Sequence, residues 1–289
     1  MYLAIIEQGL IYGILALGVY ITYKILDFPD LTVDGSFPLG AAVTAMLLTN
    51  NVNPYVTLII AFIAGAVAGI CTGLIHVKCK VRDLLAGIIM MTALWSINLY
   101  IAGTANIPLF SQETIFKNAW IDQLPIKNTY TTLLLIVGIT LLCKLLLDLY
   151  LKTKSGFLLR AVGDNQVLVT SLAKDQGNVK ILGLALSNGL VSLAGCIFAQ
   201  EQRVFEISMG TGAIVIGLAS VIIGTSLFKK VTILKATSAV LLGSVLYKAC
   251  VAIAIKQFEP QSMKLITAIL FLTILVISME RKSKVKKNA

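Results

Sequence analysis

Nine apolar segments, most of them long enough to cross a lipid bilayer, occupy almost the whole chain. A membrane-spanning helix needs roughly 17–25 predominantly apolar residues. The segments cover about residues 2–23, 36–50, 55–76, 84–103, 129–150, 179–200, 211–228, 236–256 and 264–279, and the second is short. The sequence therefore predicts an all-α polytopic membrane protein of roughly 8–10 transmembrane helices. We expect residues 1–289 to form a single transmembrane domain.

Composition argues against a sizeable soluble domain. Apolar residues make up 57% of the 289 and charged residues 13%, whereas soluble domains are typically about a quarter charged. No cleaved signal is predicted, because Glu7 interrupts the first apolar run and no basic region precedes it. We expect the first span to act as its own insertion signal.

The basic residues are unevenly distributed over the connections. Of the 24 Lys and Arg residues, seventeen fall in alternate connections or in the tail. They are Lys24, Lys78, Lys80, Arg82, Lys152, Lys154, Arg160, Lys174, Lys180, Lys229, Lys230, Lys235, Arg281, Lys282, Lys284, Lys286 and Lys287. Cytoplasmic loops carry such an excess, so the loop 152–178 and the tail 280–289 are predicted to be cytoplasmic. Nine spans then place the N-terminus outside, although a broken or re-entrant piece within 24–50 would change the count.

The net charge of +10 is interpreted as a topology signal, because no aromatic-basic platform for nucleic acid accompanies it. The loop 152–178 is unusually long and polar for a membrane protein of this size. We expect it to carry a short helix that a soluble cytoplasmic partner contacts.

No catalytic or metal-binding pattern is present in the sequence. It contains no Walker lysine motif, no Gly-x-Ser-x-Gly and no His-Glu-x-x-His. Its five cysteines form no Cys-x-x-Cys pair, and His76 is the only histidine. We therefore expect a chain that is not an enzyme and holds no cofactor or metal. Any ATP must be used by a partner subunit.

A second polar stretch interrupts the apolar pattern near the N-terminus. Residues 26–42 contain three carboxylates, two prolines and glycines, which disfavour a continuous helix. In lipid such a break survives where protein buries it or where it lines a water-filled cavity, and a half-helix N-terminus there would favour a carboxylate. The alternative is an ordinary polar loop in which Asp34 or Ser36 caps the next span.

A short echo of this stretch occurs in the second half of the chain. Residues 209–220 repeat the glycine-hydroxyl start of a small-residue helix seen at residues 34–43. Interrupted segments in corresponding halves point to an inverted repeat with a midplane site. Separately, Gly65, Gly69 and Gly73 recur at four-residue spacing, which indicates close helix packing within the chain or between two copies.

Three runs together carry a family resemblance. They are Asp30 to Ala41 (DLTVDGSFPLGA), Gly156 to Asn165 (GFLLRAVGDN) and Gly210 to Ala219 (GTGAIVIGLA). The chain resembles the permease subunits of ABC importers of the branched-chain amino acid and ribose type, through essentially its whole length. Residues 87–99 and 105–109 resemble the branch that takes up tryptophan or tyrosine.

The resemblance implies a homodimer in the cell membrane, two cytoplasmic ATPase subunits and an extracellular binding protein. It implies a coupling helix at 164–175, with Gly156 and Gly163 flanking the turn into it and Arg160 anchoring it. The expected coupling residues are Gly156, Arg160, Ala161, Gly163, Asp164 and Asn165. The expected path residues are Asp30, Thr32, Asp34, Gly35, Ser36, Asn98, Gly210 and Gly212.

Charged residues within the spans allow a second interpretation. Lys144 and Asp148 are expected to pair locally on one helix. Glu7 and Lys248 either form a structural pair or contact a solute. A secondary transporter or channel could use such groups, together with Asp30 and Asp34, for ion coupling. The long cytoplasmic loop favours the ATP-driven importer, since an ion-driven carrier has no need of it.

Overall fold

The structure is a computed structural model that describes residues 2–118, 128–164, 176–229, 234–255, 265, 267–269 and 271–276. The structure is 81% helical with almost no strands, which confirms the predicted all-α class. The helices are α1 (Tyr2–Val19), α2 (Val33–Thr49), α3 (Pro54–Val77), α4 (Asp83–Ala102), α6 (Asn128–Tyr150), α7 (Lys154–Asp164), α9 (Gln176–Gln202), α10 (Ala213–Leu227) and α11 (Ala236–Ile255).

Within the described residues, seven helices are long and apolar enough to cross a membrane. The other two predicted segments are shorter apolar helices, α2 and Thr267–Val276. All nine expected segments are thus helical where they are described. The coupling helix expected at 164–175 lies outside the described residues apart from Asp164, as does the tail 280–289.

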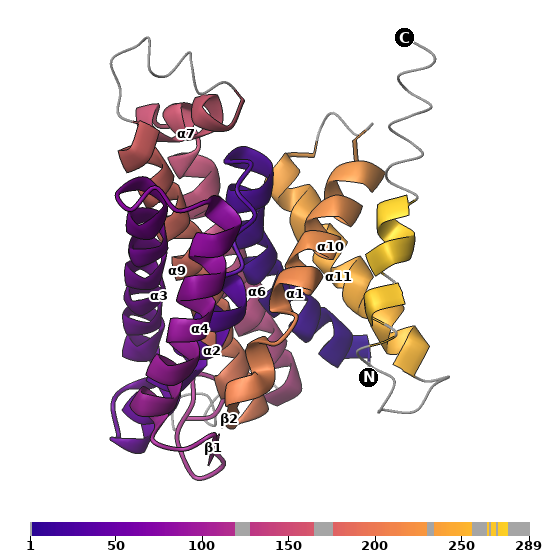
Figure 1. Ribbon diagram of the computed structural model, residues 1–289. Coiled ribbons are helices and arrows are strands. Elements are labelled where there is room, and N and C mark those ends of the chain that lie inside the picture. Colours follow the sequence, from indigo (N-terminus) through magenta and orange to yellow (C-terminus); the bar gives the residue numbers. More distant parts are fainter. Residues whose placement is uncertain are drawn as a thin grey trace.

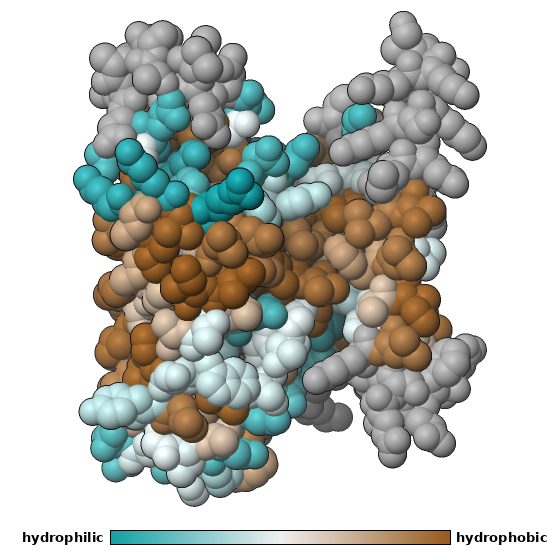
Figure 2. All heavy atoms as spheres, in the orientation of Figure 1, coloured by the Kyte–Doolittle hydropathy of each residue, from teal (hydrophilic) through white to brown (hydrophobic). Residues whose placement is uncertain are grey.

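The helices form a bundle with two distinct polar ends. Figure 1 shows α7 at one end, and the short antiparallel strands β1 (Asn106–Pro108) and β2 (Val204–Glu206) at the other. On the face shown in Figure 2, a hydrophobic band lies between more polar surfaces. This arrangement is that of a multi-pass membrane protein whose connections lie in water.

Two helices occupy the centre of the bundle. About 72% of the apolar window is buried in α9 and in the span that contains α1, against 28% in α4 and α6. The α3–α9 contact is close: a Cβ added to Gly65 would lie 2.3 Å from the Asn188 carbonyl oxygen, and one on Gly69 2.2 Å from that of Leu184. The regular glycines therefore serve packing within the chain.

Both predicted interruptions are present, but the first is shorter than expected, because residues 33–42, including Pro38, lie inside α2. A π-helical turn, Tyr20–Ile25, extends α1, and irregular backbone follows, with Asp27 at φ 52°, until α2 begins. On the other side, β2 and a 3₁₀ turn, Ile207–Gly210, separate α9 from α10, and Gly212 adopts φ 82° directly before α10. Glycine accommodates this left-handed conformation without a steric penalty.

Candidate functional site

The two interrupted segments meet at Asp34. This residue lies in the first turn of α2, but its carboxylate binds the start of α10. Its Oδ2 accepts a hydrogen bond from the Gly212 N–H at 3.0 Å, and its Oδ1 accepts one from the Ile214 N–H at 2.8 Å. Asp34 therefore caps a helix that begins 180 residues after its own begins (Val33 and Ala213). The alternative expectation, that Asp34 caps its own span, is wrong.

This geometry places one negative charge beside two helix N-termini. An N-terminus carries unsatisfied N–H groups and a partial positive charge, and here one carboxylate serves both α2 and α10. The approach is tight, because a Cβ on Gly210 would lie 2.2 Å from the Asp34 carbonyl oxygen. The structure thus brings together Asp34, Gly210 and Gly212, which the sequence had linked through the similarity of residues 34–43 to residues 209–220.

Asp30 forms a second, fully buried connection, between the start of α2 and α9. Its Oδ1 accepts the Thr32 N–H at 2.9 Å, and its Oδ2 accepts a hydrogen bond from the Asn188 amide at 2.7 Å. The Asn188 Oδ1 in turn accepts a hydrogen bond from the Ser36 hydroxyl at 2.7 Å. None of these side chains is more than 1% exposed, so the carboxylate is held by protein donors at a site that water does not reach.

Two further contacts tie α2 to its neighbours. The Thr32 hydroxyl lies 3.0 Å from that of Thr72 on α3. The Asn98 amide on α4 donates to the Gly35 carbonyl oxygen at 3.0 Å. Asn98 is fully buried, and its Oδ1 has no hydrogen-bond partner within the described part of the chain.

These contacts define what the expected path residues do within one copy of the chain. Asp30, Thr32, Ser36 and Asn98 are buried and join α2 to α3, α4 and α9, while Asp34 remains partly exposed. Sequence reasoning did not single out Asn188 or Thr72. An asparagine in the middle of an apolar span was the available signal for the first, since buried amides need partners.

The described part of the predicted coupling segment is the amphipathic helix α7. It buries Leu159 and Val162 and exposes Phe157, Arg160 and Asp164. Ala161 is half-buried, and Asn165 lies outside the described residues.

The expected turn glycines do not flank a turn, because Gly156 and Gly163 both lie inside α7. They allow close packing instead: an added Cβ would lie 2.4 Å from the Tyr150 carbonyl oxygen or 1.7 Å from that of Ile25, respectively.

A polar cluster lies behind α7, at the end of α6. Asp148 pairs with Lys144 on its own helix at 3.2 Å, as predicted, and also with Lys235 at 3.2 Å. The Thr237 hydroxyl donates to the same carboxylate at 2.6 Å. Asp148 therefore ties α6 to the start of α11 at the end of the molecule that carries α7.

Glu7 and Lys248 are not paired with each other within the salt-bridge distance among the described residues. The Lys248 ammonium lies 3.7 Å from the centre of the Tyr12 ring, a cation–π contact. Glu7 Oε1 is buried and has no hydrogen-bond partner in the described part of the chain. The described residues also contain no group of three or more His, Cys, Asp and Glu side chains able to hold a metal.

Comparison with known proteins gives a consistent result over nearly the whole length. The family described as the permease component of branched-chain amino acid transport systems matches residues 1–278. A tyrosine transport system permease protein of Clostridioides difficile (strain R20291) is 43% identical over 288 residues, which are 99% of this chain and 94% of that one.

More distant relatives transport other solutes. A probable branched-chain amino acid transport permease protein of Methanocaldococcus jannaschii is 28% identical, covering 73% of this chain and 70% of its own length. The ribose import permease protein of Escherichia coli (strain K12) is 26% identical, covering 76% and 67%. No solved structure matches the chain with statistical significance.

Proposed function

The chain belongs to the family of permease components of branched-chain amino acid transport systems, and on that premise we propose that it imports an aromatic amino acid. In this proposal two copies form the path in the plasma membrane. Two cytoplasmic ATPase subunits supply the energy, and an extracellular binding protein delivers the solute. The family consists of ABC permease subunits, which are transport components and not enzymes.

One observation supports the proposed substrate class. Identity of 43% with a tyrosine transport permease extends over 99% of the chain, whereas the branched-chain amino acid and ribose permeases share 28% and 26%. An aromatic amino acid, with tyrosine as the first candidate, is therefore the substrate we expect.

The described surface supports coupling to a soluble partner. Helix α7 is anchored by Leu159 and Val162 and presents Phe157 and Arg160 at the end where the sequence predicts cytoplasm. An exposed aromatic and an exposed arginine are residue types enriched at protein interfaces. We propose that an ATPase subunit binds this face together with the segment that follows α7.

The geometry disfavours the ion-driven alternative. Both Asp30 oxygens and both Asp34 oxygens accept hydrogen bonds from protein donors. Protonation would weaken those contacts, so an ion-coupling role would disturb the joints that hold α2 and α10.

Purification and reconstitution test the proposal. Affinity purification of the full chain from its native membrane should recover an ATPase subunit and two copies of the chain per complex, measured by native mass spectrometry. In proteoliposomes that also contain the binding protein, ATP should drive uptake of L-tyrosine in preference to L-leucine or ribose. Uptake driven by a proton or sodium gradient without any ATPase would refute it.

A further inference from the structure

A cavity opens near the end of the bundle opposite α7. Its volume is about 300 Å³, and its walls come from α1, α6, α9 and the loop that follows β1. This volume is at the lower end of the range that small-molecule sites occupy. The basic residues of the opposite end place this end outside the cell, where a solute arrives.

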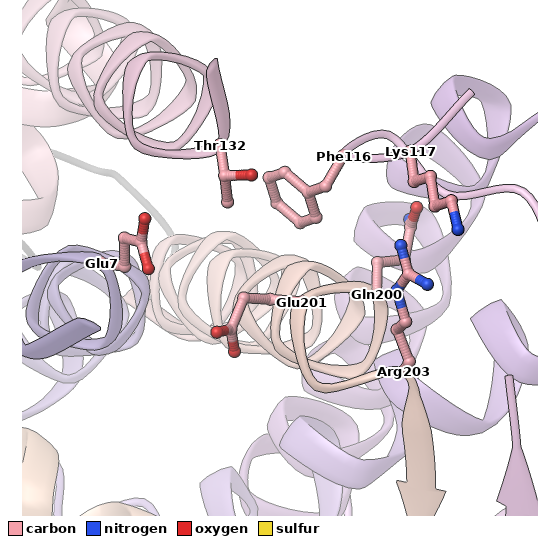
Figure 3. A pocket seen from close by; sticks show the side chains of 7 residues that line it. All are labelled: Glu7, Phe116, Lys117, Thr132, Gln200, Glu201 and Arg203. Atoms are coloured by element: carbon pink, nitrogen blue, oxygen red, sulfur yellow. The ribbon is translucent and has the colours of Figure 1, made fainter. Parts of the chain in front are cut away.

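Glu7 supplies an unsatisfied acceptor to the cavity. Its side chain is 7% exposed, and its Oε1 has no hydrogen-bond partner within the described residues. Figure 3 shows the carboxylate beside the cavity, on the same side as Glu201. An ionised carboxylate this deep in a membrane protein is costly without a partner. Glu7 therefore needs a hydrogen-bond donor from a ligand in the cavity, and a cationic donor would stabilise it most.

No cationic side chain among the described residues forms a salt bridge with Glu7. Glu201 accepts a hydrogen bond from the Gln202 side chain, and it lies within electrostatic range of both Glu7 and Lys248. The Lys248 ammonium lies over the Tyr12 ring. Glu201 thus lies within reach of one carboxylate and one ammonium group, and an additional positive charge between Glu7 and Glu201 would be stabilised.

The opposite side of the cavity is basic. Figure 3 shows Lys117 and Arg203 near each other, across the cavity from the two carboxylates. Arg203 follows the end of α9 with φ 54°, a conformation that non-glycine residues adopt infrequently. The cavity therefore has an acidic side and a basic side that are separated in space.

The wall between these sides is fixed by hydrogen bonds. The Gln200 Oε1 accepts the Ile115 N–H at 3.0 Å, and its Nε2 donates to the Thr57 hydroxyl at 3.0 Å. These bonds hold the loop that places Phe116, 7% exposed, against the cavity. The wall between the two sides is therefore built from buried groups with fixed positions, while Glu201 and Arg203 are half-buried and Lys117 is exposed.

We propose that this cavity binds the zwitterionic head group of an α-amino acid on its way into the transporter. The ammonium group lies between Glu7 and Glu201, and the carboxylate faces Arg203 and Lys117. Phe116 provides the apolar contact beside them. A neutral sugar carries neither charge and would offer Glu7 only uncharged hydroxyl donors, which bind a carboxylate more weakly than an ammonium group does. This inference rests on the proposed function, because it assigns the outer binding site of that same importer.

Equilibrium binding to the full chain in lipid nanodiscs tests the charge requirement. Tritiated L-tyrosine is the probe, and the competitors are L-leucine, tyramine, 3-(4-hydroxyphenyl)propionate and ribose. Tyramine lacks the carboxylate and the propionate lacks the ammonium, so both should compete at least about tenfold more weakly than unlabelled L-tyrosine. Equal competition by tyramine and L-tyrosine would overturn the assignment of the basic side.

Variants test the residues. Glu7→Gln and Arg203→Gln should each weaken binding by about tenfold or more, while Glu206→Gln, an exposed carboxylate at the same end, should bind as the unchanged chain does. Size-exclusion profiles show whether each variant is folded, and Glu201→Gln replaces Glu7→Gln if the latter does not assemble. Unchanged binding in folded variants of Glu7 and Arg203 would overturn the proposal.

The outcomes separate this inference from the proposed function. If ATP drives tyrosine uptake equally well in the folded variants, the importer assignment stands and the cavity assignment fails. If the chain binds L-leucine more tightly than L-tyrosine with the same dependence on both charges, the cavity assignment stands and the aromatic preference fails. If the variants still bind L-tyrosine but no longer bind the extracellular binding protein, a side chain of that protein occupies the cavity and the inference is wrong.

Discussion

Single residues in this protein act mainly by joining helices that the sequence separates widely. Asp34 is the clearest case, because one side chain in α2 satisfies two N–H groups of α10. Hydropathy and proline positions revealed the break around it. They could not reveal its partner, since a cap supplied from another helix depends on how the chain folds back.

Asp34→Ala should destabilise the permease more than Asp34→Asn. Alanine removes both acceptors, and loss of a helix N-cap costs roughly 0.5–2 kcal/mol. Asparagine keeps one acceptor oxygen but loses the charge that both N-termini favour, so transport should fall more than assembly does. Thermal unfolding in detergent measures the first effect and uptake measures the second. Glu113→Ala, an exposed carboxylate elsewhere, is the control.

Asn188→Ala should be among the most damaging polar substitutions. It leaves the buried Asp30 carboxylate with one donor fewer and leaves the Ser36 hydroxyl without its acceptor. A buried charge that loses its partner costs roughly 3–5 kcal/mol. The double variant Asp30→Ala/Asn188→Ala should lose less than the sum of the single effects, because the buried Asp30 carboxylate that lost its donor is no longer present. Strict additivity in thermal unfolding would contradict this network.

Whole helices follow the sequence more closely than the joints do. Hydropathy is a local property, so all nine apolar segments were predictable, and so were the breaks before α2 and before α10. Pro38, by contrast, lies inside α2 and does not break it. Helix α7 was not predicted at Lys154–Asp164, because a short amphipathic helix gives a weak hydropathy signal, and the coupling helix expected at 164–175 lies outside the described residues apart from Asp164. The cavity was also missed, since Glu7, Glu201 and Arg203 meet only through tertiary packing.

The α3–α9 contact predicts opposite effects for two glycine substitutions. Gly65→Ala forces a Cβ to within 2.3 Å of the Asn188 carbonyl oxygen, while Gly138→Ala in α6 meets nothing within 4 Å. The first should separate the two helices and reduce folded yield. The second should be neutral or stabilise by roughly 0.5–1 kcal/mol, because glycine weakens a helix interior. Comparable melting temperatures for the two variants would contradict the packing.

Coupling through α7 predicts a separation between assembly and transport. Arg160→Ala alters an exposed side chain and should leave membrane insertion unchanged. Stimulated ATP hydrolysis and uptake should fall at least about tenfold, if Arg160 is an interface anchor of the kind that dominates binding energy. Lys154→Ala, also exposed but at the start of α7, is the matched control. Full stimulated ATPase activity in the Arg160→Ala variant would contradict the role of Arg160 as an interface anchor.

At the scale of the whole molecule, charge and fold together predict the orientation in the membrane. The basic connections gather at the end that carries α7, while β1 and β2 mark the other end. The positive-inside rule predicts that the first end lies in the cytoplasm. A cysteine at Lys152 should therefore resist an impermeant thiol reagent in intact cells, and one at Phe110, 69% exposed, should react. Both belong in a background without the native cysteines. After the cells are opened, Lys152→Cys should label as fast as Phe110→Cys, which shows that the membrane protected it. Rapid labelling of Lys152→Cys in intact cells would invert the topology, and with it the outer position of the Glu7 cavity.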